Sequence, residues 1–206
     1  MIRTPGTRHP GSAVGLLQTG VSAVLLAMTS VLLVGCHSPS GGRLPDSATA
    51  EQEESAGYTL LRELLDDEAQ VDGILILKSA SPETESLLKE IAVACVDMRG
   101  EIDDMARADD QLVLVNTGLP DIETSARARI SSEMAGLLLG AESSEFELRI
   151  LMTQEQAMGY GHHLAAALAD AEDDPDRITV LERMANDMKT FQERCLVLLR
   201  ARCEVD

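Results

Sequence analysis

From Tyr58 onward, apolar residues recur every three or four positions along the chain. This spacing matches the 3.6-residue period of a helix that buries one face, and the two-residue alternation of a half-buried strand is nearly absent. The sequence therefore predicts an all-α fold, namely an antiparallel helical bundle of four long helices and one shorter helix. Residues 57–206 are the expected bundle domain.

The first two helices of this domain are expected to form a hairpin. The first is expected to end near Lys78, and Ser81 and Pro82 then supply an N-cap and a first-turn proline for the second. The connection is short, so the two helices should lie antiparallel. One acidic residue, Glu68, lies on the apolar stripe of the first helix, among the residues expected to face the core. The expected core residues are Leu61, Leu64, Val71 and Leu75 in the first helix and Leu88, Ile91, Cys95, Met98, Ile102 and Met105 in the second.

Residues 109–119 interrupt the pattern, and we expect a loop whose apolar residues cover one end of the bundle. A shorter helix restarts at Pro120, with Gly140 just beyond its end. Ser144 and Glu147 have the spacing of a capping box, which predicts the start of a fourth helix. The expected core residues are Ile122, Ala126, Ile130, Met134 and Leu137 in the shorter helix and, after a cap at Asp174 and Pro175, Leu181, Met184, Met188, Phe191, Cys195 and Leu198 in the last helix.

One row of the fourth helix has almost no side-chain bulk, with alanine or glycine at every fourth position from Ala157 to Ala169. Gly161 in this row costs about 1 kcal/mol relative to alanine, so close packing or a local distortion must compensate. Either a facing helix lies against the row, or the row lines a pocket. In the second case Gln154, Met158 and Gly161 are the candidate pocket residues.

Residues 1–35 have the order of a secretory signal, in which two arginines precede an apolar run and no acidic residue occurs. The run ends in Leu-Val-Gly-Cys at residues 33–36, which resembles the lipobox of bacterial lipoproteins. The resemblance implies that Cys36 carries a covalent lipid, becomes the mature N-terminus and anchors an exported chain in the cell envelope. One alternative is an uncleaved span over residues 11–35, which is just long enough to cross a bilayer, and another is a signal peptide with an ordinary cleavage site.

The residues after Cys36 extend this hypothesis. His37, rather than aspartate, follows the cysteine, which by the same resemblance favours the outer membrane of a two-membrane bacterium. Residues 36–56 are rich in Ser, Gly, Pro and charge, and we expect a flexible tether with the first helix beginning near its Glu-rich end.

Without residues 1–35 the chain has 171 residues, with 15 basic and 35 acidic side chains and a net charge of −20. Phosphate backbones and anionic headgroups would be repelled, so nucleic acid is not an expected partner. The acidity is either a solvated surface or a surface that binds a cationic partner. We therefore expect contact with the membrane through the lipid and a candidate protein partner on the acidic surface.

Carboxylates on the inner faces of a helical bundle invite comparison with ferritin-like proteins. Those proteins bind two metal ions through Glu-x-x-His pairs, and here Gly159 and Tyr160 stand three residues before His162 and His163. The pattern is therefore missing. A metal- or redox-active bundle stays as the alternative function, with candidate ligands Glu68, Glu133, Glu147 and His162.

Three segments of the body, residues 118–123, 146–147 and 154–160, are similar to segments of uncharacterised exported bacterial helical proteins with a ferritin-like shape. The resemblance covers most of residues 58–200 and implies a shape without an activity.

No serine or cysteine stands out as a nucleophile with a base and an orienting acid, and no glycine-rich phosphate loop follows a strand. We therefore favour a non-enzymatic envelope protein and expect no cofactor other than the lipid on Cys36. Cys95, Cys195 and Cys203 are either buried thiols or partners in a disulfide.

Overall fold

The computed structural model describes residues 47–115 and 117–203, so Cys36 and the signal-like segment lie outside the described residues. The all-α prediction is confirmed, because every regular element in the described ranges is helical. None of the helices described is long and apolar enough to cross a membrane. The elements are α1 (Ser47–Glu68), a 3-10 helix η2 (Val71–Ile76), α2 (Pro82–Ala108), α3 (Asp121–Gly140), α4 (Ser143–Ala171) and α5 (Pro175–Cys203).

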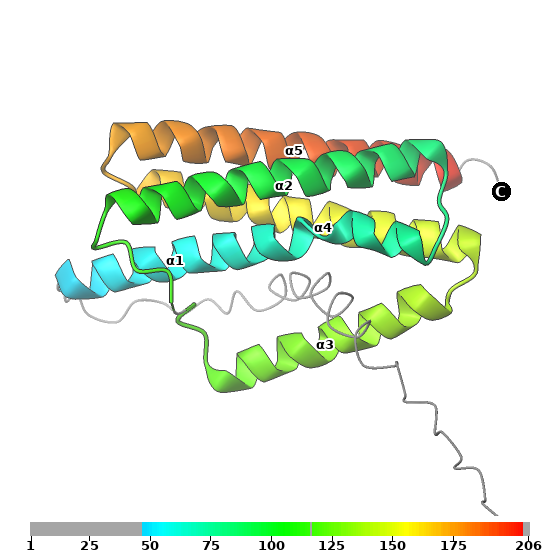
Figure 1. Cartoon of the computed structure of the whole chain (residues 1–206), viewed down its shortest axis with the longest axis horizontal. Helices are drawn as coiled ribbons and strands as arrows, with labels where there is room; N and C mark the ends of the chain where they lie inside the picture. Colours follow the sequence, from blue (N-terminus) through cyan, green and yellow to red (C-terminus); the bar gives the residue numbers. More distant parts are fainter. Residues whose placement is uncertain (1–46, 116, 204–206) are drawn as a thin grey trace, which may run out of the picture.

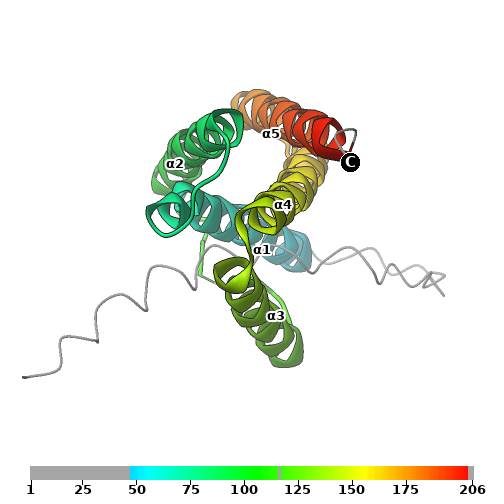
Figure 2. The same cartoon turned by 90° about the vertical axis from the view of Figure 1, so that its right-hand side faces the viewer.

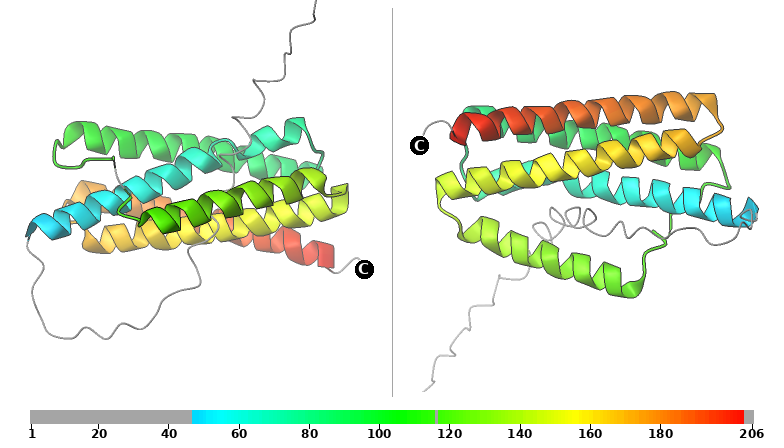
Figure 3. Two further views of the ribbon diagram at one scale, coloured as in Figure 1. Left: turned by 90° about the horizontal axis from the view of Figure 1, so that it is seen from below. Right: turned by 180° about the vertical axis from the view of Figure 1, so that it is seen from behind.

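Helices α1, α2, α4 and α5 form a four-helix bundle, in which α1 lies beside α2 and α4 beside α5 (Figure 2). Each helix runs antiparallel to its neighbours (Figure 1). Helix α3 lies outside the bundle and carries the chain back along its length, from the end of α2 to the start of α4 (Figure 3). Because of this crossover, α2 and α4 run in the same direction at diagonally opposite corners.

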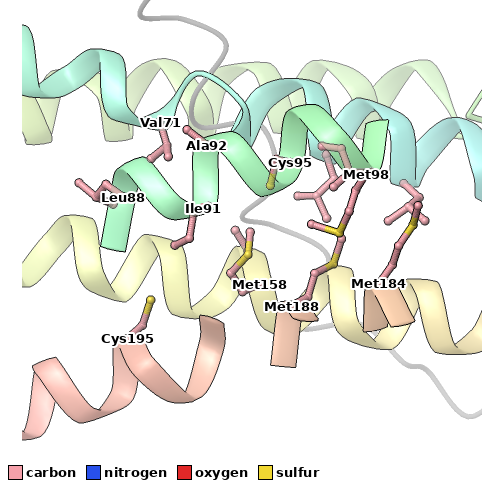
Figure 4. Close-up of a cluster of buried hydrophobic side chains, with 14 of the residues drawn as sticks. Val71, Leu88, Ile91, Ala92, Cys95, Met98, Met158, Met184, Met188 and Cys195 are labelled. Atoms are coloured by element: carbon pink, nitrogen blue, oxygen red, sulfur yellow. The ribbon is translucent and has the colours of Figure 1, made fainter. Parts of the chain in front are cut away.

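The apolar stripes of α2 and α5 supply much of the core. The predicted stripe of α2 is buried from Leu88 to Ile102. In α5, Leu181, Met184, Met188 and Cys195 are buried, whereas Phe191 and Leu198 are only half-buried. Figure 4 shows methionine and cysteine side chains from several helices gathered in this core. Thioethers are flexible enough to fill irregular space between helices.

Two predicted caps start the helices as expected. Ser81 Oγ accepts a hydrogen bond from the Thr84 N–H at 3.4 Å at the start of α2. Asp174 Oδ1 accepts from the N–H groups of Asp176 at 2.8 Å and Arg177 at 3.2 Å at the start of α5. A proline opens each of these two helices, where its missing N–H costs nothing.

The predicted end of the first helix at Lys78 is wrong, because α1 ends at Glu68 and η2 follows. A 3-10 helix has three residues per turn, so Val71 and Ile74 share its buried side and Leu75 is only half-buried. At its other end, α1 begins ten residues before the predicted domain boundary at residue 57. This stretch is rich in Ala and Glu, which favour helix, so helix replaces the second half of the expected tether.

The predicted capping box at the start of α4 is also wrong. Glu142 is the N-cap residue, no side chain caps the helix, and the Glu147 carboxylate binds side chains of other helices instead. Gly140 is the last residue of α3 rather than the residue beyond it. Among the described residues only Gly118 has a positive φ, at 69°, so Gly140 is not in the left-handed conformation.

Helix α3 turns a different face to the bundle from the one predicted. Ser131 and Leu138 are buried, and the Arg127 side chain is only 11% exposed. These positions recur at helical spacing and form the inner side. The predicted stripe is not buried. Ile122 is 85% exposed, Ala126 and Leu137 are also exposed, and Ile130 and Met134 are half-buried. Since α3 carries apolar residues on several sides, periodicity could not select the buried one.

The loop before α3 covers the bundle end less than expected. Leu112 is buried at 6% exposure, but Val113 and Val115 are 49% and 81% exposed. Of these three apolar side chains, only that of Leu112 is therefore buried against the bundle end as predicted.

Candidate functional site

A carboxyl group and an amide group are buried together inside the bundle. Glu68, the last residue of α1, is 1% exposed, and Gln154 of α4 is 0% exposed. The Gln154 amide donates a hydrogen bond from Nε2 to Glu68 Oε2 at 2.8 Å. Gln154 Oε1 is buried and accepts no hydrogen bond from the part of the chain described. The pair therefore links α1 to α4 and leaves one polar atom unsatisfied.

The surroundings of this pair disfavour negative charge. Burial raises the pKa of Glu68 to about 8, and nearby Asp67 also raises it, while the hydrogen bond from Gln154 lowers it. The pKa of Asp67 is itself raised to about 7 by burial and by the charges of Asp66 and Glu63. Both carboxyl groups therefore hold their protons more tightly than a carboxyl group in water.

Two thiols share the core with Glu68. Cys95 of α2 and Cys195 of α5 are buried and free, so they do not form the disulfide that the sequence left open. Burial raises the pKa of both thiols, to about 12 for Cys195, and the charge of Glu68 contributes to each shift. A thiol with a raised pKa is a poor nucleophile. The Cys203 side chain lies outside the described residues.

Glu147, a predicted candidate ligand, lies at one end of the bundle and binds three other side chains. Its Oε1 accepts hydrogen bonds from Ser81 Oγ at 2.5 Å and Thr84 Oγ1 at 2.6 Å, and Arg202 pairs with it. Burial alone would raise its pKa, but the hydrogen bonds from Ser81 and Thr84 and the charge of Arg202 leave that pKa lowered. Glu147 thus joins α4 to α2 and α5.

Glu172 has the equivalent role at the opposite end, which sequence reasoning missed. Tyr58 Oη donates to Glu172 Oε2 at 2.6 Å, and Arg177 Nε lies 3.1 Å from the same oxygen. The other oxygen, Oε1, accepts from the N–H groups of Asp173 at 3.0 Å and Asp174 at 2.9 Å. The sequence predicts a cap at Asp174 but no partner for Glu172, because nothing local points to Tyr58.

The four candidate metal ligands do not come together. Glu68 pairs with Gln154, Glu147 lies at the bundle end, Glu133 is exposed on α3, and His162 Nδ1 lies 2.9 Å from the Ala185 carbonyl oxygen. Glu147 and His162 are 15 residues apart on α4, which is about 22 Å along the helix axis. Within residues 47–115 and 117–203, no group of three or more His, Cys, Asp or Glu side chains has a metal-binding arrangement.

The three candidate pocket residues lie in packed core. Gln154, Met158 and Gly161 are all buried. A methyl group added to Gly161 would lie 2.8 Å from Leu64 Cδ2 and would also overlap the Met188 sulfur. Side chains of α1 and α5 therefore occupy the space beside Gly161.

Charge is unevenly distributed over the helices. Helix α1 has seven acidic residues and one basic residue, and α2 has seven and three, which gives net charges of −6 and −4. Helix α5 has four acidic and six basic residues and a net charge of +2. Four of its arginines pair with carboxylates of neighbouring segments. The pairs are Arg177 with Asp109, Arg183 with Glu101, Arg194 with Glu90, and Arg202 with Glu147.

Comparison of the chain with protein-family models, curated proteins and solved structures gives no match. Among the described residues, the most buried carboxylates each have a partner in the core or at a bundle end, and the two core thiols are shielded from solvent. The described residues form a helical body in which α1 and α2 together have a formal net charge of −10.

Proposed function

We propose that this chain is an exported, lipid-anchored protein of the cell envelope that binds another protein and has no enzymatic activity of its own. In this proposal Cys36 carries the lipid, residues 37–46 link it to the bundle, and the outer membrane is the favoured location. The Leu-Val-Gly-Cys sequence at residues 33–36, at the end of a signal-like segment, supports the anchor.

The uneven charge of the bundle carries the binding part of the proposal. Helices α1 and α2 lie side by side and together have a formal net charge of −10, or −9 without the buried Glu68 (Figure 2), whereas most arginines of α5 are already paired. Two ion pairs, Arg62 with Asp103 and Arg99 with Asp66, hold α1 on α2. The remaining negative charge of this face would attract a partner that presents lysine or arginine side chains.

Asp67 of α1 is half-buried, and its pKa is raised to about 7 by burial and then by repulsion from Asp66 and Glu63. A basic side chain placed nearby would offset that repulsion and favour the ionised form of Asp67. The proposed partner is therefore a protein with a basic surface.

Site-specific photo-crosslinking in the native cells tests the binding face. A crosslinking residue replaces either Asp97, which is exposed on α2, or Glu193, which is exposed on α5 and serves as the matched control. We expect one partner protein to be crosslinked from position 97 and not from position 193, with a yield that falls as salt is raised. Equal crosslinking from both positions would contradict a specific acidic face.

Metabolic labelling with a fatty acid tests the anchor. Label should enter the wild-type chain and be absent from Cys36→Ser. Equal labelling of the two, or no labelling of either, would refute lipidation at Cys36.

A metal- or redox-active bundle has less support. Glu68, Glu133, Glu147 and His162 are spread over different parts of the molecule, and the core thiols have raised pKa values. Elemental analysis of the purified chain distinguishes the two functions, because a stoichiometric transition metal would favour the alternative.

A further inference from the structure

The buried pair of Glu68 and Gln154 has an imbalance of donors and acceptors. An ionised carboxylate only accepts hydrogen bonds, whereas a protonated carboxyl group also donates one. The Gln154 amide already donates from Nε2 to Glu68, but its Oε1 is buried without a donor. Leaving a buried acceptor unsatisfied costs about 1–3 kcal/mol. A proton on Glu68 would supply the missing donor.

We propose that Glu68 is protonated in the folded protein at neutral pH and donates its hydroxyl hydrogen to Gln154 Oε1, so that acid and amide form a doubly hydrogen-bonded, pH-sensitive latch between α1 and α4. One proton satisfies both side chains. The latch is independent of any partner on the acidic surface, because both residues are inside the bundle.

The groups around Glu68 favour its neutral form. On its own helix the neighbour is Asp67, which is acidic, and Glu68 lies at the C-terminal end of α1, where the helix dipole is negative. Across the core, the charge of Glu68 raises the pKa of Cys95 on α2 and of Cys195 on α5. The charge of Glu155 on α4 also raises the pKa of Cys195. Within residues 47–115 and 117–203 no basic group acts on Glu68, and burial raises its pKa to about 8.

Ionisation of Glu68 would weaken the latch. Loss of the proton removes the donor to Gln154 Oε1 and places a negative charge between the helices, where the hydrogen bond from Gln154 Nε2 offsets only part of the cost of its burial. The contact of α1 with α4 should therefore weaken as the pH rises through about 8, while it persists at lower pH.

Carbon-13 NMR of the glutamate side-chain carboxyl groups in the full-length chain tests the protonation state. The resonance that disappears in Glu68→Gln belongs to Glu68, and Glu193→Gln assigns an exposed glutamate as the control. We expect Glu68 to titrate with a midpoint near pH 8, well above the value of about 4.3 for a glutamate side chain in a model peptide. A Glu68 midpoint near that of Glu193 would overturn the proposal.

The pH dependence of unfolding tests the latch itself. Glutamine at position 68 can both donate to and accept from Gln154 but does not titrate, so Glu68→Gln should lose less thermal stability than the wild type between pH 6 and pH 9. The same alkaline loss in both proteins would also overturn the proposal. If Glu68→Gln does not fold, Gln154→Met supplies the assignment instead. Glu68 is then the carboxyl resonance whose titration midpoint differs between this variant and the wild type. The midpoint of that resonance in the wild type decides whether Glu68 is protonated at neutral pH.

Discussion

Adding one methyl group at Gly161 tests how closely α4 packs on its neighbours. In a helix interior, alanine is favoured over glycine by about 1 kcal/mol. Here the new Cβ would lie 2.8 Å from Leu64 Cδ2 and overlap the Met188 sulfur, and these neighbours are only 3% and 0% exposed, so they have no solvent to move into. Overpacking of this kind costs about 1–3 kcal/mol. We therefore expect Gly161→Ala to lower the free energy of unfolding by up to about 2 kcal/mol, the overpacking cost less the gain in helix propensity, and Gly161→Leu to lower it further.

Gly100 provides the matched control, because a methyl group added at this position in α2 meets no atom within 4 Å. Urea unfolding should show that Gly100→Ala gains up to about 1 kcal/mol. The cost of Gly161→Ala should also shrink in a Met188→Ala background, since the two side chains would compete for one space. A gain from Gly161→Ala equal to that from Gly100→Ala would refute close packing and reopen the pocket beside Gln154.

Three further outcomes are expected. Tyr58→Phe removes the hydroxyl that donates to Glu172 and should cost about 1.5–3 kcal/mol in denaturant unfolding, because the acceptor is charged; a neutral result would mean that water replaces it. The lowered pKa of Glu147 means that its stabilisation is present above the unfolded value of 4.5 and is lost as the pH falls through the folded value, so Glu147→Gln should flatten the acid side of the stability profile. Iodoacetamide at pH 8 should label Cys95 and Cys195 slowly in the folded chain and faster in urea, as followed by peptide mass spectrometry, and fast labelling of the folded chain would contradict their burial.

Features determined by neighbouring residues could be predicted from the sequence. The caps at Ser81 and Asp174 act on N–H groups two or three residues away, and in both cases a capping residue type is followed at once by proline. Ser144 has no such proline after it and does not cap α4. The buried stripe of α2 follows from spacing within one helix, because its other faces are polar enough to leave a single choice.

Features determined by residues far apart in the chain could not be predicted from the sequence. Glu68 and Gln154 were both singled out, one as a metal ligand and the other as a pocket residue, but nothing in the sequence pairs two side chains 86 positions apart. The same holds for Tyr58 and Glu172, which are 114 positions apart. The inner face of α3 depends on how the crossover lies against the bundle, and local periodicity contains no information about that contact.

The position of α3 outside the bundle divides the molecule into two helical hairpins, α1 with α2 and α4 with α5, joined by one connecting strap (Figure 3). The contacts between the hairpins are made by α1 with α4 and by α2 with α5, and do not involve the strap. The same contacts would form if the α4–α5 hairpin came from a second copy of the chain, which is the geometry of a domain-swapped dimer. Cutting the strap would leave each hairpin covalently intact and make their association depend on protein concentration.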